Sequence, residues 1–327
     1  NHTVGDLIDS SHFWDYAQYT VHHRKDIYTV TQRMINTATL SSETINGEGL
    51  VGFHLGDGAT YVYLTGEEYY DIFPCWDFQL IPGTTVEYGT TCSVDHHVGH
   101  YGTTSTVGGA SNGLATVAAW EFQAPSIPAD PKKHDNVACV QSLSYHRTTV
   151  FMQACFVVLT TAMSSNTSSP VVTTLDSRAL NGSVTVWSSV GGSSQQLPRG
   201  SHATSRIKML HHNSIGYLFP GMADVSITND AVVGNWTKLA NRMTGNPTRD
   251  LFTATVQHGV KLENVDFVYV VFPGVSAVQF PDLAQQYLAD TAIIANSAKA
   301  QVLHVRANSS IATSAKGDFL CGNDFRH

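Results

Sequence analysis

The sequence is poor in charged residues. Only 13% of its 327 residues are charged, about half the share that is usual in soluble domains. The net charge is −8 and no Lys/Arg cluster is visible, which argues against a nucleic-acid-binding protein because such proteins carry a basic patch. A chain with so few charges must build its surface from Ser, Thr, Asn and Gly. This composition favours a secreted or extracellular protein.

The chain also lacks a long apolar run. The longest, residues 150–163, is interrupted by Gln153 and is shorter than the roughly 20 apolar residues that a membrane-spanning helix needs. We therefore expect no transmembrane segment. The sequence shows no signal peptide and does not begin with Met, so we expect a processed or partial product.

None of the five cysteines forms a CxxC pair, which argues against a zinc knuckle. Cys75 and Cys92 flank a short loop and could pair in an oxidising compartment. Cys139 and Cys155 lie in apolar, strand-like runs and are expected to be core thiols.

Asparagine sequons are frequent. Five N-x-S/T tripeptides begin at Asn1, Asn166, Asn181, Asn235 and Asn308. Together with the low charge they predict glycosylation on a eukaryotic-type secretory route.

Most of the chain has a β pattern. Short runs of β-branched and aromatic residues alternate with Gly, Pro, Asn and Ser clusters. Strands are expected at 27–30, 61–63, 116–120, 149–161, 183–187, 215–219, 251–257 and 267–272. Short helices are expected at 282–288 and 235–243. Many strands with few helical periods predict an all-β fold of the sandwich type.

One Gly-rich stretch, residues 41–86, concentrates polar chemistry. It contains Glu43, Asn46, Glu48, His54 and Asp57 between strand-like segments, and such a stretch could line a polar cleft. A carboxylate can orient a catalytic partner or accept from a sugar hydroxyl, and an amide can bind a carboxylate. The alternative is a turn with solvated acids. A glycosidase carboxylate pair remains open, because sequence spacing does not give the separation in space.

Histidine occurs 16 times. A metal could be held by Asp95, His96, His97 and His100, but nothing fixes a geometry and a solvated loop is the better interpretation, so no metal site is predicted. Exposed acids would suit calcium, yet no ligand loop can be recognised.

Two further histidine pairs differ in their expected roles. His22, His23 and Arg24 could place positive charge on a cleft wall. His211 and His212 precede a strand, where one would face in and one out, and a structural role is favoured.

Several segments resemble one family in chain order. They are ETINGEGLVGFHLGDGATYVY, YYDIFPCWDFQLIPGTTV, VHHRKDIYTVTQRM, GGASNGLATVAAWEF, HHNSIGYLFP, VVGNWTKLAN, QHGVKLENVDFVYVVFPG and NSAKAQVLHV. Together they resemble the central β domain of polysaccharide lyase family 8, which contains hyaluronate, chondroitin and xanthan lyases.

This resemblance implies a large antiparallel β-supersandwich, similar to galactose mutarotase. It suggests a lead-in over residues 1–20, the central sandwich over 21–291, and the start of a small C-terminal β module over 292–327. In the family an α/α-toroid precedes the sandwich and carries the main catalytic Asn, His, Tyr and Arg. Residues 1–20 do not resemble that toroid, so we expect it to be a separate domain or chain.

The resemblance implies β-elimination in an acidic, uronic-acid-containing polysaccharide of the glycosaminoglycan type, with no cofactor. The family's E-x-x-N pattern falls on Glu43 and Asn46, the candidate catalytic residues. Substrate contacts are expected from His22, His23, Arg24, Glu48 and Trp76. The family's NGEN reads NGEG here, so its final amide is missing. The alternative is an inactive, lyase-derived module that binds carbohydrate or has a structural role.

Overall fold

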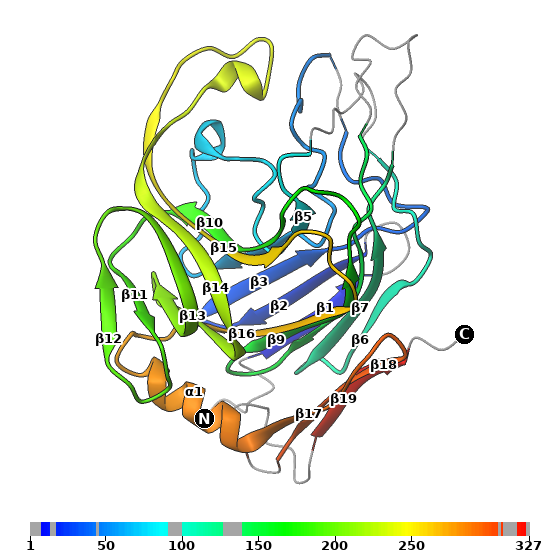
Figure 1. Cartoon of the computed structure of the whole chain (residues 1–327), viewed down its shortest axis with the longest axis vertical. Helices are drawn as coiled ribbons and strands as arrows, with labels where there is room; N and C mark the ends of the chain where they lie inside the picture. The colour runs from blue at the N-terminus through cyan, green and yellow to red at the C-terminus, as the bar shows by residue number, and fades with distance from the viewer. Residues whose placement is uncertain are drawn as a thin grey trace.

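The computed structural model describes residues 8–13, 18–43, 46–90, 100–126, 139–306, 309 and 319–324 (Figure 1). The strands are β1 Ile8–Phe13, β2 Tyr19–Arg24, β3 Tyr28–Arg33, β4 Thr60–Tyr63, β5 Thr85–Glu87, β6 Val107–Ser111, β7 Thr116–Gln123, β8 Ser144–Phe151, β9 Phe156–Ser164, β10 Val171–Ala179, β11 Val184–Trp187, β12 Ser194–Leu197, β13 Gly200–His212, β14 Ile215–Val233, β15 Thr248–Gly259, β16 Val265–Pro273, β17 Thr291–Asn296, β18 Ala300–Val305 and β19 Phe319–Asp324. The helices are η2 Phe73–Cys75, η3 Trp236–Lys238 and α1 Phe280–Asp290.

The strands form three antiparallel sheets. The first has the order β1-β2-β3-β4. The second has 12 strands and follows β12-β11-β13-β14-β16-β9-β8-β7-β6, with β10, β15 and β5 attached beside β14. The third has the order β17-β18-β19. The predicted all-β, antiparallel sandwich is confirmed. Strand β1 lies inside the segment that was expected to be a lead-in, and it pairs with β2 along its whole length.

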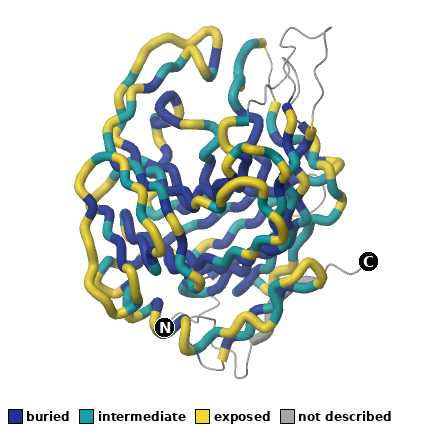
Figure 2. Tube along the Cα trace, in the orientation of Figure 1, coloured by how far each residue is buried: buried dark blue, intermediate teal, exposed yellow. Residues whose placement is uncertain are grey.

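The main core lies between the first two sheets. Tyr28, Val30 and Val62 of the smaller sheet pack against strands β7, β8, β9 and β14–β16 of the larger one. Figure 2 shows this buried interior running through the middle of the molecule. The other face of the larger sheet is covered as well, because α1 and β18 pack on Val157 and Leu159 of β9. Strand β9 is therefore buried on both faces, which explains the unbroken apolar run of residues 156–159 in its first half.

Two sequence expectations differ from the structure. The apolar run at 149–161 spans parts of two strands, β8 and β9, joined by a tight turn in which Met152 N donates to Cys155 O. The helix expected at 235–243 is only the short η3, while the one expected at 282–288 lies inside α1. Within the described parts of the chain, no helix is long and apolar enough to cross a bilayer.

Candidate functional site

The candidate catalytic residues lie in the long loop between β3 and β4. Glu43 and Asn46 are both exposed, and Glu48 is half-buried. Asn46 and Gly47 both have left-handed backbone, with φ of 55° and 77°. Asparagine and glycine are the residues that adopt this conformation most readily, so the local sequence favours the turn that follows Asn46.

The loop is held just before Glu43. Ser41 N donates to His100 O at 2.8 Å, and His100 N donates to Ser41 Oγ at 3.1 Å. The Arg33 guanidinium at the end of β3 donates to the carbonyl oxygens of Ser41 and Leu40. The position of Glu43 therefore depends on a histidine that lies 57 positions later in the sequence.

His100 belongs to a buried charge network around Asp57. Asp57 is fully buried, accepts from His54 Nδ1 at 2.8 Å and lies 3.3 Å from His100 Nε2. Both His100 nitrogens face oxygen: Nδ1 is 3.0 Å from Tyr101 O and Nε2 is 3.1 Å from Phe53 O. Because a ring nitrogen must carry a proton to bond a carbonyl, this geometry suits the charged imidazolium.

The shifts in pKa agree with a buried ion pair. Burial alone would lower the pKa of His100, but the Asp57 carboxylate outweighs it and the pKa is raised. Burial alone would raise the pKa of Asp57, but His100 and His54 hold it well below its usual range. The sequence placed His54 and Asp57 in the polar stretch but grouped His100 with a possible metal cluster. No local signal links His100 to Asp57.

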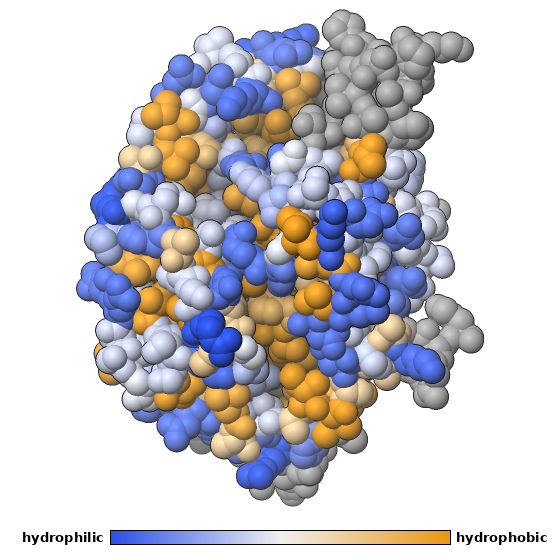
Figure 3. Space-filling view, viewed as in Figure 1, coloured by the Kyte–Doolittle hydropathy of each residue, from blue (hydrophilic) through white to orange (hydrophobic). Residues whose placement is uncertain are grey.

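A pocket of about 480 Å³ opens beside this loop. Its walls come from distant parts of the chain: residues 50–54 after Glu48, residues 74–79 around η2, Thr90, and the β14–β15 hairpin. In the space-filling view, hydrophobic side chains gather between the end of this hairpin and the neighbouring loops (Figure 3). The structure thus brings predicted Trp76 into the same pocket as the continuation of the Glu43–Glu48 loop.

Trp76 is 8% exposed and belongs to an aromatic cluster. Its ring is stacked on that of Tyr61, with the ring centroids 6.4 Å apart. It meets the rings of Phe73 and Phe78 edge-on, with centroid distances of 5.0 and 5.6 Å. Such packing fixes the indole as a rigid wall of the pocket. Lys238 of η3 also lines the pocket and is exposed; none of the described acidic side chains forms a salt bridge with it.

The structure does not place His22, His23 and Arg24 beside Glu43. They end β2, next to the turn into β3, whereas Glu43 follows the opposite end of the six-residue β3. A strand of that length spans about 20 Å. His22 is 1% exposed, with Nδ1 2.8 Å from Ser10 Oγ, and contacting a polymer would require its ring to turn outward. His23 is exposed and Arg24 half-buried.

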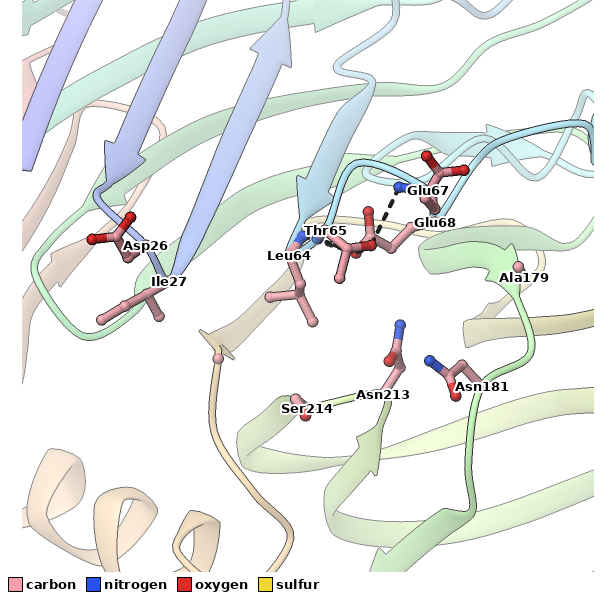
Figure 4. A pocket seen from close by; sticks show the side chains of 11 residues that line it. Asp26, Ile27, Leu64, Thr65, Glu67, Glu68, Ala179, Asn181, Asn213 and Ser214 are labelled. Atoms are coloured by element: carbon pink, nitrogen blue, oxygen red, sulfur yellow. Dashed lines mark hydrogen bonds between the residues drawn. The ribbon is translucent and has the colours of Figure 1, made fainter.

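A second pocket, of about 630 Å³, lies at that end of the sheets (Figure 4). Three acidic residues, Asp26, Glu67 and Glu68, line it together with Asn181 and Asn213. Glu68 is fixed by backbone N–H groups of Leu64, Thr65 and Gly66. Its lining carries three acidic residues and no Lys or Arg, whereas the pocket at Trp76 carries Asp77 and Lys238, so this pocket fits a uronate chain less well.

The remaining predictions concern metals, cysteines and sequons. In the part of the chain that the structure describes, no cluster of three side chains could hold a metal. His96, His97 and Cys92 lie outside the described residues, as do Asn1 and Asn308. The suggested pairing of Cys75 is wrong because Cys75 is a buried free thiol; Cys139, expected to be a thiol, is disulfide-bonded.

The described sequon asparagines differ in exposure. Asn166 and Asn181 are exposed, while Asn235 is half-buried and its Oδ1 accepts from Thr237 N at the start of η3. Whether any of the three carries a glycan stays a prediction.

Comparison with known proteins identifies the family. Residues 9–284 match the polysaccharide lyase family 8 super-sandwich domain, and the chain belongs to that family. It is 31% identical to chondroitinase-AC of Pedobacter heparinus over 271 residues, which are 81% of this chain and 35% of that enzyme. It is 25% identical to hyaluronate lyase HylB of Enterococcus faecalis, covering 72% of this chain and 24% of that enzyme.

Solved structures agree with the fold. A chondroitinase AC lyase studied in complexes with oligosaccharides has a TM-score of 0.77 and 28% identity, over 91% of this chain and 42% of that one. Paenibacillus xanthan lyase has a TM-score of 0.75 and 24% identity, over 91% of this chain and 28% of that one. The chain thus spans between about a quarter and a third of the length of the curated relatives it matches.

Proposed function

We propose that this chain is the β-sandwich portion of a secreted polysaccharide lyase that cleaves an acidic, uronic-acid-containing polysaccharide of the glycosaminoglycan type. The main observation is that the family's E-x-x-N pattern, at Glu43 and Asn46, is exposed on a loop anchored beside a pocket. The main proton-transferring residues would lie on an α/α-toroid domain or chain that faces this loop.

The proposed reaction is a β-elimination. A base on the toroid removes the proton from C5 of the uronate, an amide neutralises the carboxylate, the C4–O bond breaks, and the leaving oxygen takes a proton. The products are an unsaturated uronate and a new chain end. Glu43 would orient the Tyr and Arg of the toroid, because general acid–base catalysis requires fixed neighbours. Asn46 would contact the substrate with its exposed amide.

Substrate contacts would come from both sides of the loop. Glu48 lies two residues after Asn46, and Trp76 forms a rigid wall of the adjacent pocket. Lys238, which sequence reasoning missed, offers a cation to an acidic sugar in the same pocket. His23 and Arg24 lie about a strand length away, and they would act only on a more distant part of a long polymer.

The disulfide at Cys139 supports secretion, since disulfides persist mainly in oxidising compartments. The exposed sequons at Asn166 and Asn181 are compatible with glycosylation there. The alternative is a glycan-binding or structural module without activity, and the missing final amide of the NGEN pattern, Gly49 here, is the observation that favours it.

Activity on defined polymers separates the two functions. The native full-length protein is incubated with hyaluronate, chondroitin or alginate, and the ultraviolet absorbance of unsaturated uronate is followed. We expect an increase with at least one polymer, and a loss of about 100-fold or more in Glu43→Gln, the scale of general acid–base effects. Glu67→Gln, which alters an exposed carboxylate in the other pocket, is the matched control.

The absence of any signal from the intact protein on all uronate polymers would refute the lyase assignment. If Glu43→Gln kept full activity in an active enzyme, the class would stand but the assigned site would not.

A further inference from the structure

The end of the β14–β15 hairpin reaches the candidate catalytic loop. The connection between the two strands, residues 234–247, extends beyond the sheets at the upper left of Figure 1 and is largely exposed in Figure 2. We call residues 235–245 the hairpin tip. Exposed loops of this length are usually free to move, so contacts that hold one in place need a reason.

The tip is anchored at its base. Gly234 N donates to Pro247 O at 2.7 Å, which closes the connection, and Asn235 N donates to Pro74 O at 2.9 Å. A Cβ atom on Gly234 would lie 2.7 Å from Cys75 Sγ, so the hairpin passes against the η2 segment without room for a side chain. The base of the tip is thereby fixed to the same segment that carries Trp76.

The far end of the tip is joined to the loop after Asn46. Asn241 N donates to Gly47 O at 2.9 Å, and Leu50 N donates to Leu239 O at 3.1 Å. Between these bonds Glu48 and Ala240 form an isolated antiparallel bridge. The candidate catalytic loop therefore pairs with the tip at a single bridge, through main-chain bonds that do not depend on side-chain identity.

Close packing accompanies these bonds. A Cβ atom on Gly47 would lie 2.3 Å from Asn241 Nδ2, a distance that requires the neighbour to move. Gly47 is adjacent to Asn46 and has φ of 77°. The Asn241 side chain thus lies against the backbone that follows the E-x-x-N segment. On the N-terminal side of the same segment, Ser41 is hydrogen-bonded to His100.

We propose that the hairpin tip, through the main-chain hydrogen bonds of Leu239 and Asn241 to the loop after Asn46, is the positioning element that sets the direction of Glu43 and Asn46 toward the substrate. Asn241 touches no reacting atom and is a positioning residue. The proposal rests on the proposed lyase function for its kinetic consequence, while the packing itself can be tested without activity.

The test uses Gly47→Ala in the native full-length protein. We expect kcat to fall by about 10- to 100-fold, because a misplacement of about 1 Å can cost about 10²-fold, while KM changes by less than about twofold. Gly182→Ala is the matched control: Gly182 has φ of 82°, and its Cβ would meet no atom within 4 Å. It introduces the same backbone strain without a collision and should keep the wild-type kcat.

A second substitution separates positioning from general damage. Adding Asn241→Gly to Gly47→Ala removes the colliding amide and should recover a large part of kcat. Hydrogen exchange provides a readout without substrate: the Asn241 and Leu50 amides should exchange slowly in the wild type and faster together in Gly47→Ala.

Two results would overturn the proposal: an unchanged kcat in Gly47→Ala of an active enzyme, or exchange of the two amides that does not respond to Gly47→Ala. If the wild-type protein cleaves no uronate polymer, the proposed function fails, and the exchange measurement still decides whether the tip holds the loop.

Discussion

Replacing Asp57 with Asn tests whether a buried ion pair supports the catalytic loop. Asp57 is fully buried between His54 and His100. The substitution removes the negative charge and leaves the His100 imidazolium buried. Breaking a buried pair in this way costs about 3–5 kcal/mol, because one charge stays without compensation. We expect the free energy of unfolding to fall by about that amount at pH 5.5.

The loss in the free energy of unfolding should depend on pH, and the direction of this dependence follows from the two pKa shifts. The pKa of His100 is raised, so its contribution to stability is full below about pH 6.5 and is lost as the pH rises through the folded value. The pKa of Asp57 is lowered, so its contribution is present above about pH 4 and is lost at lower pH. The pair therefore stabilises most between these limits.

Above the folded pKa of His100 the ring is neutral, and Asp57→Asn then mainly weakens the hydrogen bond from His54, because an uncharged amide replaces the carboxylate that accepts it. A hydrogen bond to a charged group contributes about 1.5–3 kcal/mol, so the loss at pH 9 should be about 2 kcal/mol smaller than at pH 5.5. Urea denaturation followed by tryptophan fluorescence at both pH values measures the difference.

Asp250→Asn is the control, because Asp250 pairs with Arg199 on the surface, where both side chains are about half exposed. Its denaturation midpoint should not move detectably at either pH. If Asp57→Asn lowers the free energy of unfolding by the same amount at pH 5.5 and pH 9, the charged state of His100 is refuted. A loss no greater than that of the control would refute the role of the pair.

Three further predictions concern binding, acid stability and modification. Lys238→Ala should weaken binding of an acidic polymer several-fold and reduce its dependence on salt, as measured by titration at two ionic strengths, whereas exposed Lys299→Ala should not. Burial lowers the pKa of His22 to about 4, so the unfolded chain binds its proton first and stability should fall from pH 6.5 toward pH 4; His22→Gln should flatten this decline in urea midpoints. In protein secreted from eukaryotic cells, mass spectrometry should find glycans at exposed Asn166 and Asn181, and unmodified peptides at both sites would contradict the prediction.

Two histidine predictions show where sequence reasoning reaches its limit. On an alternating strand, His211 and His212 were expected to face opposite environments, yet both are buried. His211 Nε2 lies 2.8 Å from Val275 O, and the ring of His212 is stacked on that of Phe252 with the ring centroids 4.0 Å apart. The alternation holds, but the larger sheet is covered on both faces, so neither direction leads to water. Covering of the second face is a tertiary property that a local pattern does not contain.

The sequence by itself determined the strand-rich architecture and the family, because alternating β-branched residues and ordered motifs are local features. It also indicated Glu43 and Asn46 through the resemblance, and the turn at Asn46-Gly47 through residue types that accept left-handed backbone. Only the tertiary structure decided which distant residues support that turn. His100 reaches Ser41, and Asn241 reaches Gly47, through main-chain hydrogen bonds. Such bonds can form with almost any residue type, and they therefore leave little trace in a single sequence.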